Sequence, residues 1–216
     1  MKNVRVVKWA GALALASIVG TSVGWAGTPP PSELAARWWT WVLEIPKAQN
    51  PLLDDTGQFA GVGQSGPVWF LAGTWGGGPA TRAFTVPAGK PLFFPIANFF
   101  SCGHVTGPKA ATVPPGPIHS QRELAKAFID TLIYLECDVD GVPVPITAQN
   151  REQSVPFAVR FPAYNLFMDE AFTCSPGVDE GYYVLLAPPT KGQHVIHFAA
   201  AGPGFTLDVT DYITVK

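Results

Sequence analysis

Charged residues are scarce in this chain. Of its 216 residues, 14 are Lys or Arg and 16 are Asp or Glu, which gives a net charge of −2 at pH 7. A protein that binds nucleic acid or an anionic membrane surface needs a basic patch that neutralises phosphate groups. The low and nearly balanced charge therefore argues against a nucleic-acid partner and against electrostatic attachment to lipid.

Known catalytic motifs are missing as well. Ser65 lies in a Gly-Gln-Ser-Gly-Pro run, which lacks the second glycine of a nucleophile elbow. The glycine run at 76–78 lacks the Gly-Lys-Ser or Gly-Lys-Thr ending of a phosphate-binding loop. His194 and His197 lie three residues apart in a predicted strand, so they point to opposite faces and cannot share a metal ion. We therefore expect no metal site and no cofactor.

One weaker possibility for chemistry remains in the long predicted loop 101–118. Cys102 and His104 stand close together at its start, and they could form half of a metal site or a thiol–imidazole pair. No second group of residues has the spacing of a metal site. A disulfide at Cys102 would remove this possibility.

Long apolar runs are confined to the first 26 residues. Lys2, Arg5 and Lys8 precede an uncharged apolar stretch at 9–23, and small residues follow at Gly24 and Ala26. This pattern predicts a secretory signal peptide over 1–26, cleaved after Ala26. A membrane anchor is the alternative, but the stretch is short and rich in Gly, Ala and Ser. We expect a periplasmic or extracellular protein with no membrane span after cleavage.

Cysteine is rare, and its odd number suggests one disulfide and one free thiol. Cys137 lies in Leu-Glu-Cys-Asp-Val, where apolar and acidic residues alternate, so it is predicted to face inward from a strand. Cys102 and Cys174 lie in polar segments flanked by Gly or Pro, which we interpret as loops. We predict a Cys102–Cys174 disulfide, although the sequence leaves the other two pairings open.

Glycine and proline are abundant, with 22 residues of each, and 12% of the residues are aromatic. This composition indicates many turns and short strands. The segment 66–100 holds three short apolar runs, at 68–72, 83–86 and 92–97, which turns at 74–79 and 87–90 separate. None of the runs alternates cleanly between apolar and polar residues, so both faces of this unit are predicted to be covered.

Two short helices are predicted. The first spans 32–45, with Ser32 as its cap and Pro46 as its stop. Its apolar face consists of Leu34, Trp38, Trp41, Val42 and Ile45, and Trp39 lies off that face. The second helix follows a capping box at Ser120 and Glu123 and carries a stripe formed by Leu124, Phe128, Leu132 and Leu135.

The remaining chain reads as strands. They are predicted at 135–139, 142–146, 155–161, 182–187, 193–200 and 205–215, with Pro156 favouring an edge position. About nine strands with two helices indicate a mainly β protein. We predict a single β-sandwich domain over 27–216, of the jelly-roll or immunoglobulin-like type.

Four runs in the mature chain, VWFLAG, VPAGKPLFFPIAN, DVDGVPV and GQHVIHF, resemble a recurrent pattern in exported bacterial proteins of unassigned function. The resemblance covers most of the mature chain. It implies export and a β-rich fold, and it carries no activity and no site residues.

Tryptophan is the most distinctive feature of the N-terminal part. Trp39 lies off the apolar helix face and Trp75 lies in a Gly-rich turn, so both are predicted to be exposed. Exposed aromatic rings beside polar turns suit a sugar ring or a protein surface. We assign Trp39 and Trp75, with the turn carboxylates Asp54 and Asp55, as candidate ligand-binding residues.

Three functions remain open, of which a purely structural envelope protein, with neither a pocket nor an exposed aromatic patch, is the third. The first is a non-enzymatic, exported binding module for a glycan or an envelope protein. The alternative is an exported hydrolase that acts on a polysaccharide or ester through His104 or through loop carboxylates. The predicted loop pairs are Asp54 and Asp55, Asp169 and Glu170, and Asp179 and Glu180.

Overall fold

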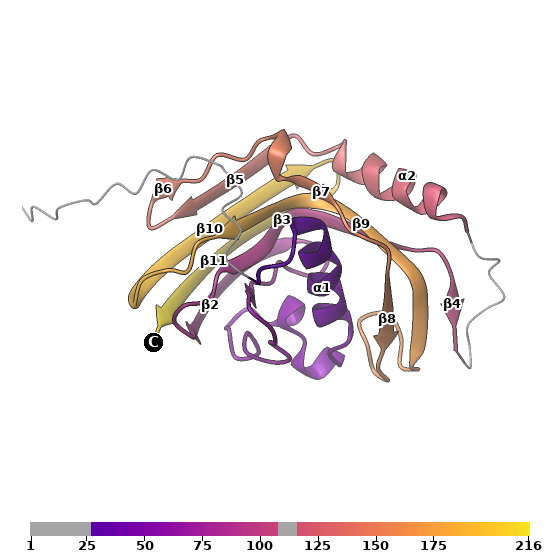
Figure 1. The fold of residues 1–216 in the computed structure, drawn as a ribbon, viewed down its shortest axis with the longest axis horizontal. Coiled ribbons are helices and arrows are strands. Elements are labelled where there is room, and N and C mark those ends of the chain that lie inside the picture. Colours follow the sequence, from indigo (N-terminus) through magenta and orange to yellow (C-terminus); the bar gives the residue numbers. More distant parts are fainter. Residues whose placement is uncertain (1–26, 108–115) are drawn as a thin grey trace, which may run out of the picture.

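The computed structural model describes residues 27–107 and 116–216. The predicted signal peptide lies outside the described residues, so cleavage after Ala26 stays a prediction. Two mixed β-sheets and two short helices make up the fold (Figure 1). The prediction of a mainly β sandwich is confirmed.

The first sheet, sheet A, is built around the long strand β9. Strands β3 and β4 pair with one edge of β9, β7 and β8 pair with its other edge, and β1 adds to β3 in parallel. The strands are β1 (Trp69–Phe70), β3 (Leu92–Cys102), β4 (Val105–Thr106), β7 (Arg151–Gln153), β8 (Phe157–Phe161) and β9 (Phe172–Leu186). The edge position that Pro156 suggested for the neighbouring strand is confirmed for β8.

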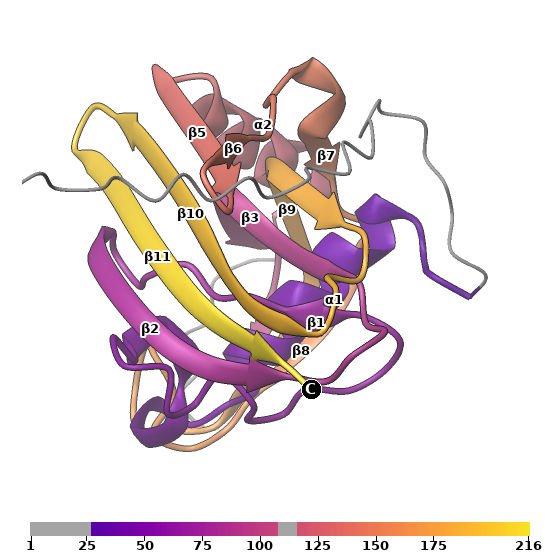
Figure 2. The ribbon, with the colours of Figure 1, turned by 90° about the vertical axis from the view of Figure 1, so that its left-hand side faces the viewer.

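The second sheet, sheet B, has the order β2-β11-β10-β5-β6 (Figure 2). Its strands are β2 (Gly78–Val86), β5 (Tyr134–Val139), β6 (Val142–Pro143), β10 (Gly192–Gly202) and β11 (Phe205–Val215). β2 runs parallel to β11, and the other neighbours are antiparallel. The last strand in sequence therefore lies inside the sheet, between β2 and β10.

Sheet A is buried on both faces at β1 and in the first half of β3, as predicted for the runs at 68–72 and 92–97. The same prediction is wrong for the run at 83–86, which lies in β2 of sheet B, where buried and exposed residues alternate. In β3, the consecutive residues Leu92, Phe93 and Phe94 have no exposed surface. Phe94 packs toward sheet B, with its ring centroid 4.9 Å from that of Phe198. Phe93 faces the opposite side and stacks on Tyr183 at 5.0 Å. Two separate cores result, one between the sheets and one between sheet A and the N-terminal segment.

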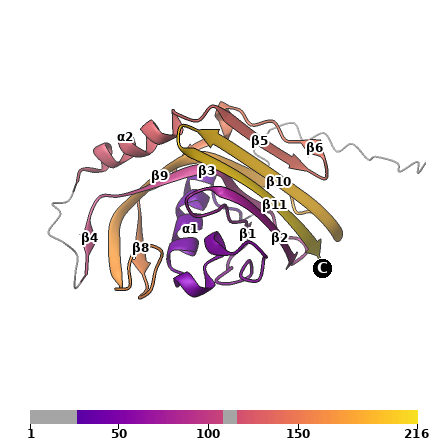
Figure 3. The same ribbon diagram turned by 180° about the vertical axis from the view of Figure 1, so that it is seen from behind.

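Helix α1 (Pro31–Leu43) covers the face of sheet A that points away from sheet B, beneath the arch of the sheets (Figure 3). It begins at Pro31 rather than at a Ser32 cap, because proline suits the first helical position, where no N–H partner is needed. Three short 3₁₀ helices also occur, at Lys47–Gln49, Pro51–Leu53 and Ala148–Asn150.

The start and the buried face of helix α2 (Ile118–Ile129) both differ from the sequence-based predictions. It starts two residues before Ser120, and no side chain caps it. It buries Ala125 and Ile129, whereas Leu124 is 56% exposed. The predicted apolar stripe included Leu132 and Leu135, which lie beyond the end of the helix. The stripe therefore did not identify the buried face of α2.

The predicted disulfide is confirmed. Cys102 and Cys174 are bridged with a Cα–Cα distance of 5.9 Å, and Cys137 is a free, buried thiol. Their placement in loops is wrong, because Cys102 ends β3 and Cys174 lies near the start of β9. In the part of the chain that the structure describes, no helix is long and apolar enough to cross a membrane.

Candidate functional site

A cleft of about 460 Å³ opens where α1, β3, α2 and the start of β11 meet the loop between β1 and β2. Its volume falls in the range of small-molecule and peptide pockets. Eight aromatic rings line it, from Trp38, Trp39, Trp75, Phe99, Phe100, Phe128, Phe167 and Phe205. Among its lining residues only Asn98 and Thr74 have polar side chains other than the indole N–H groups.

The edge of strand β3 faces the cleft. Six consecutive residues, Pro95 to Phe100, line the cleft, although successive side chains of a strand point to opposite faces. β1 pairs with β3 only at Leu92 and Phe93, so in the described residues this side of β3 has no strand partner beyond Phe93. A register shift between Pro95 and Ala97 bends β3 at this point.

Trp39 contributes to the cleft in an unexpected way. It is 6% exposed, as buried as Trp38 at 1% and Trp41 at 8%, so the prediction of a markedly exposed ring is wrong. Trp38 and Trp41 donate their indole N–H groups to the carbonyls of Leu71 and Val62, in the segment that follows the helix. Trp39 points to sheet A instead, so the helix is covered on both sides.

A buried polar network holds Trp39 in place. Its Nε1 donates to Oδ1 of Asp179 at 2.7 Å, and the hydroxyl of Tyr183 donates to Oδ2 at 2.8 Å. The side-chain amide of Asn98 donates to the Tyr183 hydroxyl at 3.0 Å. Burial raises the pKa of Asp179 to about 7, although the hydrogen bonds from Trp39 and Tyr183 act in the opposite direction.

Asp179 does not line the cleft. It is 1% exposed, and Trp39 and Tyr183 occupy its two oxygens. Its interpretation as a loop carboxylate is wrong, because Asp179 and Glu180 both lie in β9. The carboxylate of Glu180 is held by Arg151 and Gln153. The two residues therefore organise sheet A and the ring of Trp39 from behind the site.

Trp75 stands at the mouth of the cleft. It is 37% exposed, and its ring meets that of Phe167 edge to face, with centroids 5.1 Å apart. Its backbone N–H donates to the carbonyl of Leu52. The structure thus brings Trp39 and Trp75 into one site, Trp39 at the floor and Trp75 at the rim.

Asp54 and Asp55 are not among the residues that line the cleft. Asp54 is 8% exposed and accepts backbone hydrogen bonds from Thr56, Gly57 and Phe59, so it shapes the turn in which it lies. Burial alone would raise the pKa of Asp54, but the bonds from Phe59 and Thr56 outweigh it and lower the pKa. Asp55 is exposed in the same turn.

Apart from the hydroxyl of Thr74, which donates to the carbonyl of Gly78, the cleft contains no acid–base or nucleophilic side chain. Its lining residues, all within the described ranges, include no Asp, Glu, His, Lys, Ser or Cys. His104 lies outside the cleft, and its Nδ1 is buried without a hydrogen-bond partner in the described residues. The Cys102–Cys174 bridge removes the thiol–imidazole pair that Cys102 and His104 could have formed.

The β3 residues of the site were not predicted from the sequence. Asn98 is a single polar residue in an otherwise apolar and aromatic run, and this exception is the signal that could have identified it. Comparison of the chain with protein-family models, with curated proteins and with solved structures gives no match. The resemblance to exported bacterial proteins therefore stays a prediction, and the geometry of the cleft carries the functional argument.

Proposed function

We propose that this protein is a non-enzymatic, exported binding protein whose cleft takes an apolar, extended segment of another polypeptide. The observation that carries the proposal is the edge of β3, which runs along a cleft lined by eight aromatic rings. The aromatic rings offer pockets for apolar side chains, and the strand edge offers hydrogen-bonding groups of the main chain.

The edge of β3 favours a polypeptide as the occupant. An edge strand presents unpaired N–H and C=O groups, and an extended peptide satisfies them by adding a strand to the sheet. Pro95 has no N–H, so it does not serve as a donor in such a ladder. The segment after the register shift, Ala97 to Phe100, remains as the pairing surface.

A glycan is less well suited to this cleft. The hydroxyl groups of a sugar lose their hydrogen bonds to water on binding and need polar partners in return. The indole N–H groups of Trp38 and Trp39 are already bonded to protein, so the polar side-chain groups left in the cleft are those of Asn98, Thr74 and the rim residue Trp75. The hydrolase alternative lacks a catalytic group in the cleft.

Export is supported by two features. The pattern of residues 1–26 is that of a signal peptide. The Cys102–Cys174 disulfide is of the kind that persists in an oxidising compartment. A periplasmic or extracellular location follows as part of the proposal.

The test uses a panel of fluorescent hexapeptides with apolar residues at alternate positions, measured by fluorescence polarisation against the mature chain. We expect Trp75→Ala to weaken binding of the best peptide by at least about tenfold, because it removes a ring from the rim. Tyr212→Ala is the matched control, since Tyr212 is 50% exposed on sheet B and away from the cleft.

Methylation of backbone nitrogens in the peptide distinguishes strand addition from simple apolar binding. Only alternate N–H groups of an added strand face β3. Methylation of the nitrogens that face β3 should therefore abolish binding, whereas methylation of the nitrogens that face away should be tolerated. Equal binding of both methylated peptides, or binding of a glycan array that Trp75→Ala abolishes, would contradict the proposal.

A further inference from the structure

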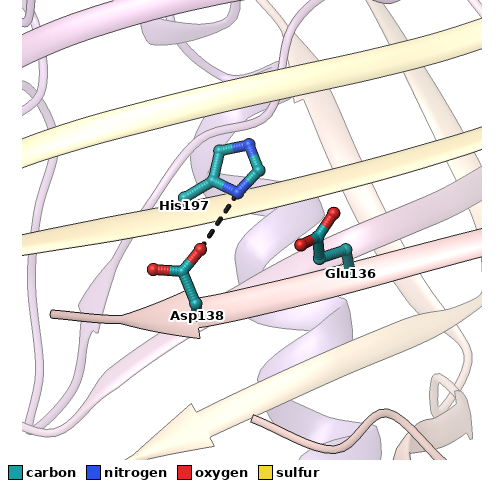
Figure 4. Close-up of side chains that lie close together, drawn as sticks. All are labelled: Glu136, Asp138 and His197. Atoms are coloured by element: carbon teal, nitrogen blue, oxygen red, sulfur yellow. Dashed lines mark hydrogen bonds and ion pairs between the residues drawn. The ribbon is translucent and has the colours of Figure 1, made fainter. Parts of the chain in front are cut away.

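A second group of side chains lies on the outer face of sheet B. His197 comes from β10, Glu136 and Asp138 come from β5, and one ligand atom from each lies within 4.8 Å of the others (Figure 4). Asp208 from β11 approaches the same imidazole from its other side. The inward neighbours Ile196 and Phe198 belong to the core, so His197 faces away from it.

The strand register fixes this arrangement. His197 is paired with Asp138, and Ala199 is paired with both Glu136 and Asp208. The small side chain of Ala199 thus lies between the two longer carboxylates and leaves the space above it to their oxygens. Three strands hold the four backbones rigidly, so small rotations of the side chains suffice to bring oxygen and nitrogen atoms around one point.

The imidazole already has the orientation of a metal ligand. Its Nε2 lies 3.1 Å from Oδ1 of Asp208, and its Nδ1 lies 3.2 Å from Oδ2 of Asp138. With the proton on Nε2 donated to Asp208, the lone pair of Nδ1 points to the Asp138 and Glu136 side. A histidine that binds metal commonly donates its other N–H to a carboxylate in this way.

The negative charge of this group also favours a bound cation. Three carboxylates surround one imidazole, and within the described ranges no Lys or Arg forms an ion pair with Glu136, Asp138 or Asp208. Tyr134 donates its hydroxyl to Glu136, which orients that carboxylate without neutralising it.

We propose that Nδ1 of His197 and the carboxylates of Asp138 and Glu136 bind one divalent transition-metal cation, with Zn²⁺ as the best match. Imidazole nitrogen and carboxylate oxygen are ordinary ligands of Zn²⁺, and three protein ligands leave at least one coordination position for water. Asp208 is a positioning residue, because it acts on the metal only through the His197 ring. The site is separate from the aromatic cleft and does not depend on its proposed function.

The test is titration of the mature, tag-free chain with ZnCl₂ by isothermal calorimetry, together with Co²⁺, whose visible absorption reports nitrogen and oxygen ligation. We expect one ion per chain. His197→Asn, Asp138→Asn and Glu136→Gln should each weaken binding by at least about tenfold, and Asp208→Asn should weaken it by about tenfold while keeping the stoichiometry.

His194→Asn is the matched control, because His194 lies on the same strand but bonds to Asp140 and Thr190. It should bind Zn²⁺ as the wild type does. Circular dichroism of each variant establishes that it is folded before the titration. The proposal would be overturned if the wild type did not bind Zn²⁺. It would also be overturned if the folded His197→Asn and Glu136→Gln variants bound Zn²⁺ as tightly as the wild type.

Discussion

The indole Nε1 of Trp39 donates a 2.7 Å hydrogen bond to Asp179, a residue 140 positions further along the chain. The bond ties α1 to the middle of β9. It also ties the floor of the aromatic cleft to a carboxyl group that is itself buried. Any change in the charge of Asp179 therefore acts on the ring that a ligand in the cleft would touch.

Replacement of Asp179 by Asn should remove part of the pH dependence of stability. Burial raises the folded-state pKa of Asp179 to about 7 from an ordinary value of 3.8, so its contribution to stability is greatest below pH 4 and is lost as the pH rises through 7. At pH 8 the variant should be more stable than the wild type by on the order of 3 kcal/mol. Urea denaturation at pH 5 and pH 8 measures the difference.

Asp169→Asn is the control for this experiment, because Asp169 is exposed. Its stability should follow that of the wild type at both pH values. An Asp179→Asn variant that is destabilised equally at pH 5 and pH 8 would show that the raised pKa does not affect folding.

Arg82 should be much less tolerant of replacement than its partner Asp211. Arg82 is 3% exposed and donates to the carbonyls of Asp54, Ala72 and Gly73, while the two oxygens of Asp211 have no hydrogen-bond partner in the described residues. Arg82→Met should cost about 3–5 kcal/mol, because it leaves these carbonyls without a donor and removes the ion-pair partner of the buried Asp211, whose Oδ1 lies 3.7 Å from Nη1 of Arg82.

Asp211→Asn should cost far less than Arg82→Met in the same denaturation experiment. Burial raises the pKa of Asp211 to about 7, so a neutral amide resembles the state that the site favours at mildly acidic pH. Equal losses from the two variants at pH 6 would mean that the pair, rather than Arg82 alone, stabilises this region.

The native protein should resist thiol reagents. Cys137 is its one free cysteine, and burial raises the pKa of this thiol to about 12, so neither access nor ionisation favours reaction. Unfolding in guanidinium without reductant should expose one thiol per chain, counted by mass spectrometry after labelling. Three labelled cysteines would contradict the Cys102–Cys174 bridge.

Gly181→Ala should damage both the fold and the cleft. A Cβ atom at Gly181 would lie 2.6 Å from the Cβ of Asn98 and 2.8 Å from the carbonyl oxygen of Ala97, so β3 would have to move. We expect a loss of about 1–3 kcal/mol and weaker peptide binding. Gly61→Ala is the control, because its Cβ would meet only the Trp69 ring at 3.8 Å.

Local alternation was sufficient to predict the inner and outer sides of β5. Glu136 and Asp138 flank Cys137, and the structure buries the thiol and leaves the two carboxylates on the outer face. The approach of His197 and Asp208 to these carboxylates could not be predicted, because it depends on which strands become neighbours and in which register. Residue spacing along one strand contains no such information.

The same limit explains the errors at Trp39 and in β9. Helical periodicity identifies the most apolar face of α1, but it does not reveal that a second layer covers the other side. In β9, Gly177 and Gly181 made an acidic segment resemble a loop. Both glycines are needed for close packing instead, since a Cβ at Gly177 would lie 2.8 Å from the ring of Phe100.

The position of β11 inside sheet B has a consequence for how the protein is made. β2 is synthesised early, yet its partner strand is β11, which follows every other strand of both sheets. A nascent chain therefore carries β2 without its partner and Arg82 without Asp211 until residues 205–215 have left the ribosome. Such long-range pairing makes folding slow and late. The newly made chain consequently stays unfolded for longer than a chain whose neighbouring strands pair as they are made.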